Sequence, residues 1–290
     1  MLVRLTAFSI SFLSCLLHVF PDLLLLWVVK PSMAERTFEA TSLKVEGMTT
    51  TVQLQMTRVA NPETEQVRER KQCDLWAYVW GSSAVLSMLL CSLPTTLLER
   101  ATCLELGAGS GAPSLCAAKL GARVTVTDLV EDALRLCESN AEANGVPVTC
   151  QVLNWDKPAK LSPTGYDLIV GADVIYLGRA VKPIARIIKG HLKDDRSLAI
   201  VVDPGRTNGD DFEDICRYEF DLACERQDIW RIRTPICNMR KVSIFLLALC
   251  SQQDLVERWS AWLQRFSQHF VSPFLVPEDD SSVSFSYRQE

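Results

Sequence analysis

Three glycines, Gly107, Gly109 and Gly111, follow an apolar run at residues 101–106 and begin a helix predicted over residues 111–120. Glycine lacks a Cβ, so the backbone of such a turn can approach a ligand closely. The turn also exposes backbone N–H groups at the N-terminus of the helix, where they can bind a carboxylate, a phosphate or ribose oxygens. The spacing predicts a binding site for a nucleotide-type ligand, and an ordinary strand-to-helix turn is the alternative.

The glycine spacing narrows the choice of ligand. A dinucleotide fingerprint needs G-x-G-x-x-G, but this chain has G-x-G-x-G, with Pro113 where a third-turn glycine would help to pack a pyrophosphate. The lysine of a triphosphate-binding loop is also missing from this stretch. What remains is the form of loop that binds S-adenosylmethionine, in which Glu105 and the backbone of Gly107, Ala108 and Gly109 hold the amino-acid end.

Two further groups suit the adenosine part of such a ligand. Asp128 ends the apolar strand predicted at residues 123–127, about 20 residues beyond the glycine turn, where a carboxylate can accept hydrogen bonds from both ribose hydroxyls. The next predicted strand, at residues 146–153, is followed by Trp155 and Asp156. A flat indole and a carboxylate at this place could sandwich an adenine ring and recognise its amino group.

A fourth apolar strand, predicted at residues 166–172, leads to another acidic residue, Asp173, with Tyr176 three positions later. In an open parallel sheet, ligands bind outside the carboxyl ends of the strands. Asp128, Trp155 and Asp173 are therefore expected on one rim of the sheet.

The elements that must position these residues alternate between strand and helix along the chain. Trp80 stands at the mouth of a helix whose apolar positions recur up to residue 93, and it is either a ligand-binding residue or part of the core. Apolar runs at residues 222–230 and 241–249 lack an intervening helix, which suits an antiparallel pair. The pattern predicts an α/β fold, namely a Rossmann-like seven-stranded, mostly parallel sheet with helices on both faces and an antiparallel edge strand.

The composition of the chain limits the classes of partner and of metal site that can be expected. The formal net charge of −5 and the sequence pI of about 5.4 give no basic footprint, which disfavours nucleic acid and favours a protein or small-molecule partner. The eleven cysteines form no zinc-type C-x-x-C pair and are interpreted as small hydrophobic core residues of a reducing compartment. None of the three histidines has a second ligand nearby in the sequence, so no metal site is predicted.

Residues 1–32 form a hydrophobic leader. Its apolar run at residues 5–29 is longer than the roughly 20 residues that span a bilayer, but Pro21 and Asp22 interrupt it. The leader is therefore an upstream extension, a membrane anchor or a cleaved signal. The expected segments that follow are a β-hairpin (strands at 38–45 and 51–56) with a linker over residues 33–72, a catalytic domain over 73–270 and a disordered tail over 271–290. We expect a cytoplasmic protein, or one anchored to a membrane through residues 5–29, and the oligomeric state is left open.

With these residues in place, the chain resembles the class I, seven-β-strand methyltransferases, and more closely their family 16 branch, which contains many lysine-directed protein methyltransferases. The resemblance covers about residues 47–249. It is based on Val79-Trp80, the Glu-Leu-Gly-Ala-Gly-Ser-Gly loop, Asp128, Asn154-Trp155, and Gly-Ala-Asp-Val-Ile-Tyr at residues 171–176, which matches the acidic-x-x-aromatic motif of the branch. It implies that the cofactor is S-adenosylmethionine, in contact with Trp80, Gly107, Ala108, Gly109, Asp128, Trp155 and Ala172.

The resemblance also implies that Asp173 and Tyr176 face the methyl acceptor, which is expected to be a lysine of a protein substrate. Our hypothesis is that Asp173 orients the lysine amine through a hydrogen bond, while Tyr176 packs against the alkyl stem. A nucleic-acid amine is disfavoured because Val174 and Ile175 stand where a proline pair is expected in such enzymes. An arginine or histidine acceptor, a small-molecule methyltransferase and a non-catalytic cofactor-binding adaptor are the alternatives.

Overall fold

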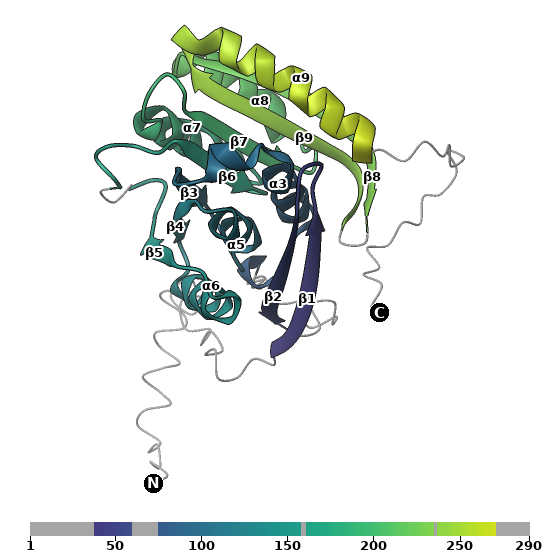
Figure 1. Ribbon diagram of the computed structural model, residues 1–290. Coiled ribbons are helices and arrows are strands. Elements are labelled where there is room, and N and C mark those ends of the chain that lie inside the picture. The colour runs from purple at the N-terminus through teal and green to yellow at the C-terminus, as the bar shows by residue number, and fades with distance from the viewer. Residues whose placement is uncertain (1–37, 60–74, 158–160, 235–236, 271–290) are drawn as a thin grey trace, which may run out of the picture. The chain divides into compact units, whose positions relative to one another are not determined.

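The computed structural model describes residues 38–59, 75–157, 161–234 and 237–270, and the structural statements below concern these residues. Their main element is a seven-stranded sheet in the order β5-β4-β3-β6-β7-β9-β8 (Figure 1). Its strands are β3 (Thr102–Leu106), β4 (Arg123–Asp128), β5 (Val148–Val152), β6 (Leu168–Ala172), β7 (Leu198–Asp203), β8 (Leu222–Thr234) and β9 (Cys237–Leu249). The helices are α3 (Gly81–Ser92), α4 (Thr95–Leu98), α5 (Ala112–Lys119), α6 (Glu131–Asn144), α7 (Gly178–His191), α8 (Asn208–Asp214) and α9 (Gln253–Phe270), with short helical turns at Leu75–Ala77, Ile215–Glu219 and Cys250–Gln252.

The strand pairing confirms the predicted Rossmann-like fold. The five strands from β3 to β7 form parallel pairs, whereas β9 runs antiparallel to both β7 and β8. The antiparallel pair closes one side of the sheet, with β8 at the edge and β9 beside it. Both strands are longer than predicted, because the pairing continues through Ile232 and Met239 although charged residues interrupt the apolar pattern there.

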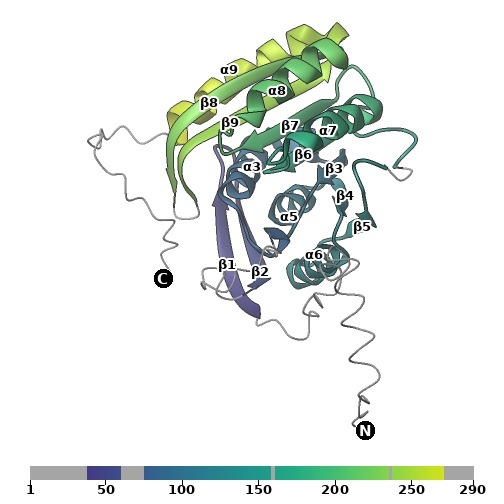
Figure 2. The same ribbon diagram turned by 180° about the vertical axis from the view of Figure 1, so that it is seen from behind.

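Helices cover both faces of the sheet, as the opposite views in Figures 1 and 2 show. Successive side chains of a strand point to opposite faces, so Val202 of β7 packs in one core cluster and Val201 in the other. The first cluster contains buried residues of α3, α5, α6 and α9, and the second contains those of α7 and α8. Because both faces are apolar, the rims of the sheet are left for polar ligands.

A separate hairpin of β1 (Phe38–Glu46) and β2 (Thr51–Val59) precedes the main sheet, in agreement with the predicted alternation. Leu54 and Met56 of β2 are buried in the same core as α5 and α6. Asn140 of α6 accepts a hydrogen bond from the Thr57 N–H at 2.7 Å and donates one to the Thr57 carbonyl oxygen at 3.2 Å. The hairpin is therefore fixed to the outside of α5 and α6 (Figure 1).

The described part of the chain contains nine cysteines, which are free, and seven of them are buried. No helix within this part is both long enough and apolar enough to cross a membrane. The leader at residues 1–32, most of the predicted linker and the predicted tail lie outside the described residues.

Candidate functional site

The strand register brings the predicted ligand-binding segments together at the carboxyl rim of the sheet. Leu106 ends β3 and pairs with Thr127 of β4 on one side and with Gly171 of β6 on the other. The segments that follow these three strands are therefore neighbours in space. They are the glycine loop, defined here as residues 107–111, and the segments that contain Asp128 and Asp173.

The positions of the three glycines in the loop do not accommodate a residue with a Cβ atom. Gly107, Gly109 and Gly111 have φ values of 62°, 55° and 82°, in the left-handed region that glycine adopts without strain. A Cβ at Gly109 would lie 2.8 Å from the carbonyl oxygen of Trp76, and one at Gly111 would lie 2.3 Å from Sγ of Cys137. These glycines allow the tight turn that presents the N-terminus of α5 at the rim, where its N–H groups can bind polar ligand atoms.

Asp128 fixes the shape of this loop. Its Oδ2 accepts a hydrogen bond from the Gly109 N–H at 3.0 Å, and its Oδ1 accepts one from the Val130 N–H at 2.9 Å. The side chain is buried, which raises the pKa of its carboxyl, while the backbone donors act in the opposite direction. Each carboxylate oxygen has a second lone-pair direction that a ribose hydroxyl can use.

Glu105 lies beneath the loop and caps the first turn of α5. Its Oε2 accepts hydrogen bonds from the N–H of Ser114, at 3.1 Å, and from the Ser114 hydroxyl. Glu105 is buried, and desolvation raises the pKa of its carboxyl to about 8 despite these donors. Glu105 therefore acts on the carboxyl rim indirectly, through its hydrogen bonds to the N-terminus of α5.

Trp155 packs directly against the glycine loop. A Cβ at Gly107 would lie 3.1 Å from Cζ2 of Trp155 and 3.0 Å from Cγ1 of Val174, so the indole and the segment after β6 enclose this glycine from two sides. The Nε1 of Trp155 is buried and has no hydrogen-bond partner among the described residues. Since buried donors are normally satisfied, this N–H is a candidate contact for an acceptor atom of a ligand.

The segment before α3 lies on the other side of the loop and brings Trp80 to the rim. The Ser110 hydroxyl donates to the Tyr78 carbonyl oxygen at 3.4 Å, and the Trp76 carbonyl oxygen lies against Gly109. Trp80 occupies the N-cap position of α3, and its ring contacts that of Tyr78 edge to face at 5.8 Å between centroids. Trp80 has 39% of its surface exposed, so part of its indole is accessible from solvent.

Asp173 follows Ala172, the last residue of β6, and its carboxylate forms an ion pair with Arg206. The backbone is held at φ 61° by a hydrogen bond of 2.8 Å from the Asp173 N–H to the Val202 carbonyl oxygen. Burial raises the pKa of the Asp173 carboxyl, and the Arg206 guanidinium opposes this shift by stabilising the charge. The result is a half-buried carboxylate with one cationic partner at the rim.

Tyr176 is the exposed member of the predicted acceptor pair. Val174 and Ile175 before it are buried, whereas Tyr176 has 42% of its surface exposed. The Asn208 side chain donates to the Ile175 carbonyl oxygen at 2.9 Å, which fixes the segment between Asp173 and Tyr176. The phenol ring is therefore available to an incoming side chain.

Two residues outside the predicted site contribute to its geometry. Arg206 donates from Nη1 to Asp203 at 2.9 Å and from its backbone N–H to the same carboxylate at 2.7 Å. Asn140 donates to the Ser110 carbonyl oxygen at 3.1 Å, in addition to its bonds to the hairpin. The Asp-x-x-Arg spacing after β7, next to the strand that carries Asp173, is the signal that points to Arg206 in the sequence.

Comparison with known proteins finds protein lysine methyltransferases among the relatives of this chain. A family model described as lysine methyltransferase matches residues 61–213. Protein N-lysine methyltransferase METTL21A from Mus musculus is 37% identical over 145 residues, which are 48% of this chain and 65% of the relative. The protein of the same name from Xenopus tropicalis is 32% identical over 57% of this chain and 78% of its own length. EEF1A lysine methyltransferase 3 from Mus musculus is 40% identical over 77 residues, which are 26% of this chain and 33% of that protein.

Among solved structures, a TehB-like SAM-dependent methyltransferase from Corynebacterium glutamicum superposes with a TM-score of 0.42 and 18% identity. The superposition covers 53% of this chain and 86% of that one.

Proposed function

Because the chain belongs to the lysine methyltransferase family, whose model matches residues 61–213, we propose that it transfers a methyl group from S-adenosylmethionine to a lysine side chain of a protein substrate. The observation that supports this most strongly is the register of β3, β4 and β6. This register places the glycine loop, which is fixed by a hydrogen bond to Asp128, beside the half-buried carboxylate of Asp173. A donor site and an acceptor site therefore share one rim.

The residues of the rim fit S-adenosylmethionine. The unpartnered Nε1 of Trp155 and the crowded glycine loop are features expected of a built site for a polar ligand. We assign the amino-acid end to the backbone of Gly107, Ala108 and Gly109, with Glu105 supporting the N-terminus of α5. The adenosine is assigned to Asp128 and Trp155, with Trp80 and Ala172 beside it. When bound, S-adenosylmethionine supplies a methyl group on a positively charged sulfur, which a neutral amine attacks in line.

The acceptor groups of the chain have two tasks. Asp173 accepts a hydrogen bond from the lysine amine and thereby aims its lone pair, and Tyr176 packs against the alkyl stem. Enclosure by the ring of Tyr176 lowers the pKa of the lysine amine through desolvation, which favours the neutral form that can react. The names of the relatives as protein lysine methyltransferases support a protein substrate.

We further propose that the protein works in the cytoplasm. Free cysteines with mostly buried side chains are typical of a reducing compartment.

Two measurements test the proposed reaction. Titration calorimetry should detect binding of S-adenosylmethionine, and the radiolabelled methyl group should then be transferred to proteins of a cell extract. No binding would contradict the methyltransferase assignment itself. Binding without label in the protein fraction would contradict a protein acceptor and favour a small-molecule methyltransferase or a non-catalytic adaptor.

A further inference from the structure

Strands β8 and β9 extend past the carboxyl rim as a two-stranded arm, which we define as residues 229–234 and 237–242. Asp203 ends β7 and pairs with Ser243 of β9, which in turn pairs with Asp228 of β8. The described residues of the hairpin beyond this pair therefore project past the end of β7, on the side of the proposed site. Figures 1 and 2 show β8 and β9 continuing past their neighbours and bending away from the sheet.

The inner side of the arm is anchored. Ile229, Ile232 and Met239 are buried. A Cβ at Gly81 would lie 2.8 Å from Sδ of Met239, so the arm packs tightly on the N-terminus of α3, next to the proposed cofactor residue Trp80. The arm is thus a fixed wall beside the site.

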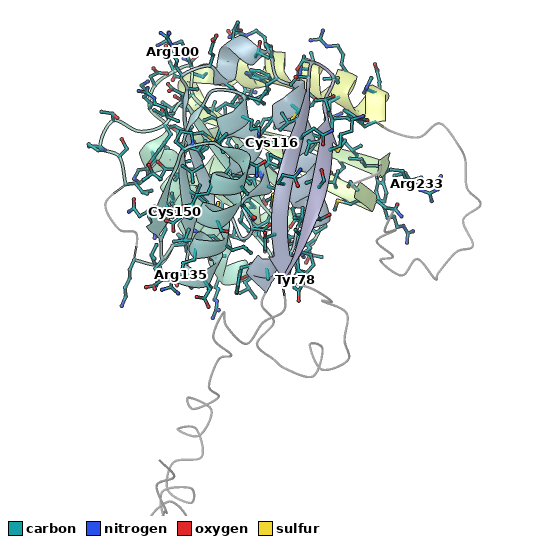
Figure 3. The ribbon with its side chains drawn as sticks, turned by 60° about the horizontal axis from the view of Figure 1, so that its bottom comes forward. Tyr78, Arg100, Cys116, Arg135, Cys150 and Arg233 are labelled. Atoms are coloured by element: carbon teal, nitrogen blue, oxygen red, sulfur yellow. The ribbon has the colours of Figure 1, made fainter. Side chains whose placement is uncertain are left out.

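The outer side of the arm is cationic. The arm contains four basic residues and no acidic one, although the whole chain has a formal net charge of −5. One of the four, Lys241, pairs with Asp228 at 2.8 Å, just outside the arm. Arg233 and Arg240 are exposed, and the structure gives neither of them an ion pair within the described part of the chain. Figure 3 shows the Arg233 side chain pointing away from the body of the protein. Trp230 adds an aromatic surface with 54% of its area exposed.

A series of contacts connects Trp230, at the base of the arm, to the acceptor carboxylate. Lys241 stacks over the ring of Trp230, with Nζ 5.3 Å from the ring centroid. The stem of Lys241 lies against Gly205, where a Cβ would be 2.7 Å from the Cδ of Lys241. Gly205 directly precedes Arg206, which is paired with Asp173. A substrate chain whose lysine lies at Asp173 therefore has its neighbouring residues close to the arm.

We propose that the arm binds an acidic segment of the protein substrate, next to the lysine that is methylated. This inference rests on the proposed function, since it assigns the flanking chemistry of the same substrate. Charge complementarity selects the occupant, because exposed cations beside an aromatic ring attract carboxylates and steer them to the site. A nucleic acid is the less suitable polyanion, because the acidic remainder of the chain would repel a long phosphate backbone.

The test is a binding measurement at low ionic strength with three fluorescent probes. These are a peptide of alternating glutamate and glycine, the same peptide with glutamine in place of glutamate, and a single-stranded RNA of equal net charge. The double variant Arg233→Glu, Arg240→Glu reverses two exposed charges of the arm. The matched control, Arg123→Glu with Arg196→Glu, makes the same charge change at two exposed positions of the opposite rim, the first residue of β4 and a residue before β7.

We expect the glutamate peptide to bind more tightly than either other probe, and the arm variant to weaken its binding by about tenfold, while the control variant changes it little. Equal binding of the glutamine peptide, or equal loss in both variants, would overturn the proposal. Tighter arm-dependent binding of the RNA would also overturn it. The assay measures peptide binding and needs no methyl transfer. A negative binding result therefore does not contradict the proposed reaction, and a lack of methyl transfer does not contradict the binding result.

Discussion

The guanidinium group of Arg206 is bonded to the carboxylate of Asp173, the residue that we propose to orient the methyl acceptor. Arg206 is itself held by Asp203, which is fully buried and accepts two of its N–H groups. A lysine amine that approaches Asp173 therefore meets a carboxylate that already has one cationic partner. The ion pair favours the ionised form of Asp173 and fixes the orientation of its carboxylate, which an incoming amine must share with Arg206.

Replacement of Asp173 tests its role as the acceptor-orienting group. Asp173→Asn is the suitable variant, because asparagine tolerates the left-handed backbone of this position whereas alanine adds strain. We expect methyl transfer to fall by at least about 100-fold, since the group that orients the reacting amine is lost. The affinity for S-adenosylmethionine, measured by calorimetry, should change little.

A matched control for this variant is Asp195→Asn, at an exposed position before β7. It should leave both transfer and affinity unchanged. Turnover by Asp173→Asn at the rate of the control would remove Asp173 from the mechanism.

Removal of the Arg206 charge should change the pH dependence of transfer. The guanidinium lowers the pKa of the Asp173 carboxyl against the effect of burial, so Arg206→Met lets Asp173 keep its proton to higher pH. If ionised Asp173 is required, the acid limb of kcat/KM against pH moves to higher pH in this variant. Arg206→Lys, which keeps the charge, should restore most of the original position. An acid limb that is the same in the methionine variant and the wild type would refute this role.

The glycine loop provides a test of the cofactor assignment. Gly109→Ala forces a side chain onto a φ of 55° and to 2.8 Å from the Trp76 carbonyl oxygen. We expect it to lower the free energy of unfolding by about 1–3 kcal/mol and to weaken S-adenosylmethionine binding about tenfold or more. Gly190→Ala is the control, because nothing lies within 4 Å of its Cβ position in α7, and it should be neutral or stabilise by up to about 1 kcal/mol. Similar cofactor affinities in the two variants would argue against the loop as the binding element.

The raised pKa of Glu105 predicts that the free energy of unfolding depends on pH. The native state keeps the proton of this buried carboxyl up to about pH 8, whereas the unfolded chain loses it near the ordinary pKa of 4.5. Between these values the native state binds more protons, so its free energy of unfolding decreases as pH rises, by up to about 1.4 kcal/mol per pH unit. Glu105→Gln stays neutral and should show a flatter dependence in urea unfolding, while exposed Glu99→Gln should behave as the wild type. A slope unchanged in Glu105→Gln would show that Glu105 is ionised when folded.

Much of the fold and the rim followed from local sequence patterns. Apolar strands that end in Asp128 and Asp173, joined to helices, allow few arrangements other than a parallel sheet with both carboxylates at one rim. The glycines of the loop carry their own conformational signal, because few other residues adopt positive φ. Prediction worked where the sequence within one strand, turn or helix decides the structure.

What the sequence did not reveal depends on contacts between distant segments. The Arg206–Asp173 pair joins the segments after β6 and β7, and nothing in either segment alone specifies it. Asn140 bonds to both the hairpin and the glycine loop, although an asparagine within a helix resembles an exposed polar residue. The end of β8 was placed too early because its charged residues face solvent on an arm that is stabilised by pairing and by α3.

The most direct test of the proposed reaction is the identity of the methylated amino acid. Proteins of a cell extract are incubated with the purified protein and S-adenosylmethionine carrying a radiolabelled methyl group, then hydrolysed completely and separated by chromatography. We predict that the label elutes with methylated lysine and is absent when Asp173→Asn replaces the wild type. Label found in methylarginine or methylhistidine alone, or lysine labelling that persists with Asp173→Asn, would contradict the proposed reaction and its acceptor site.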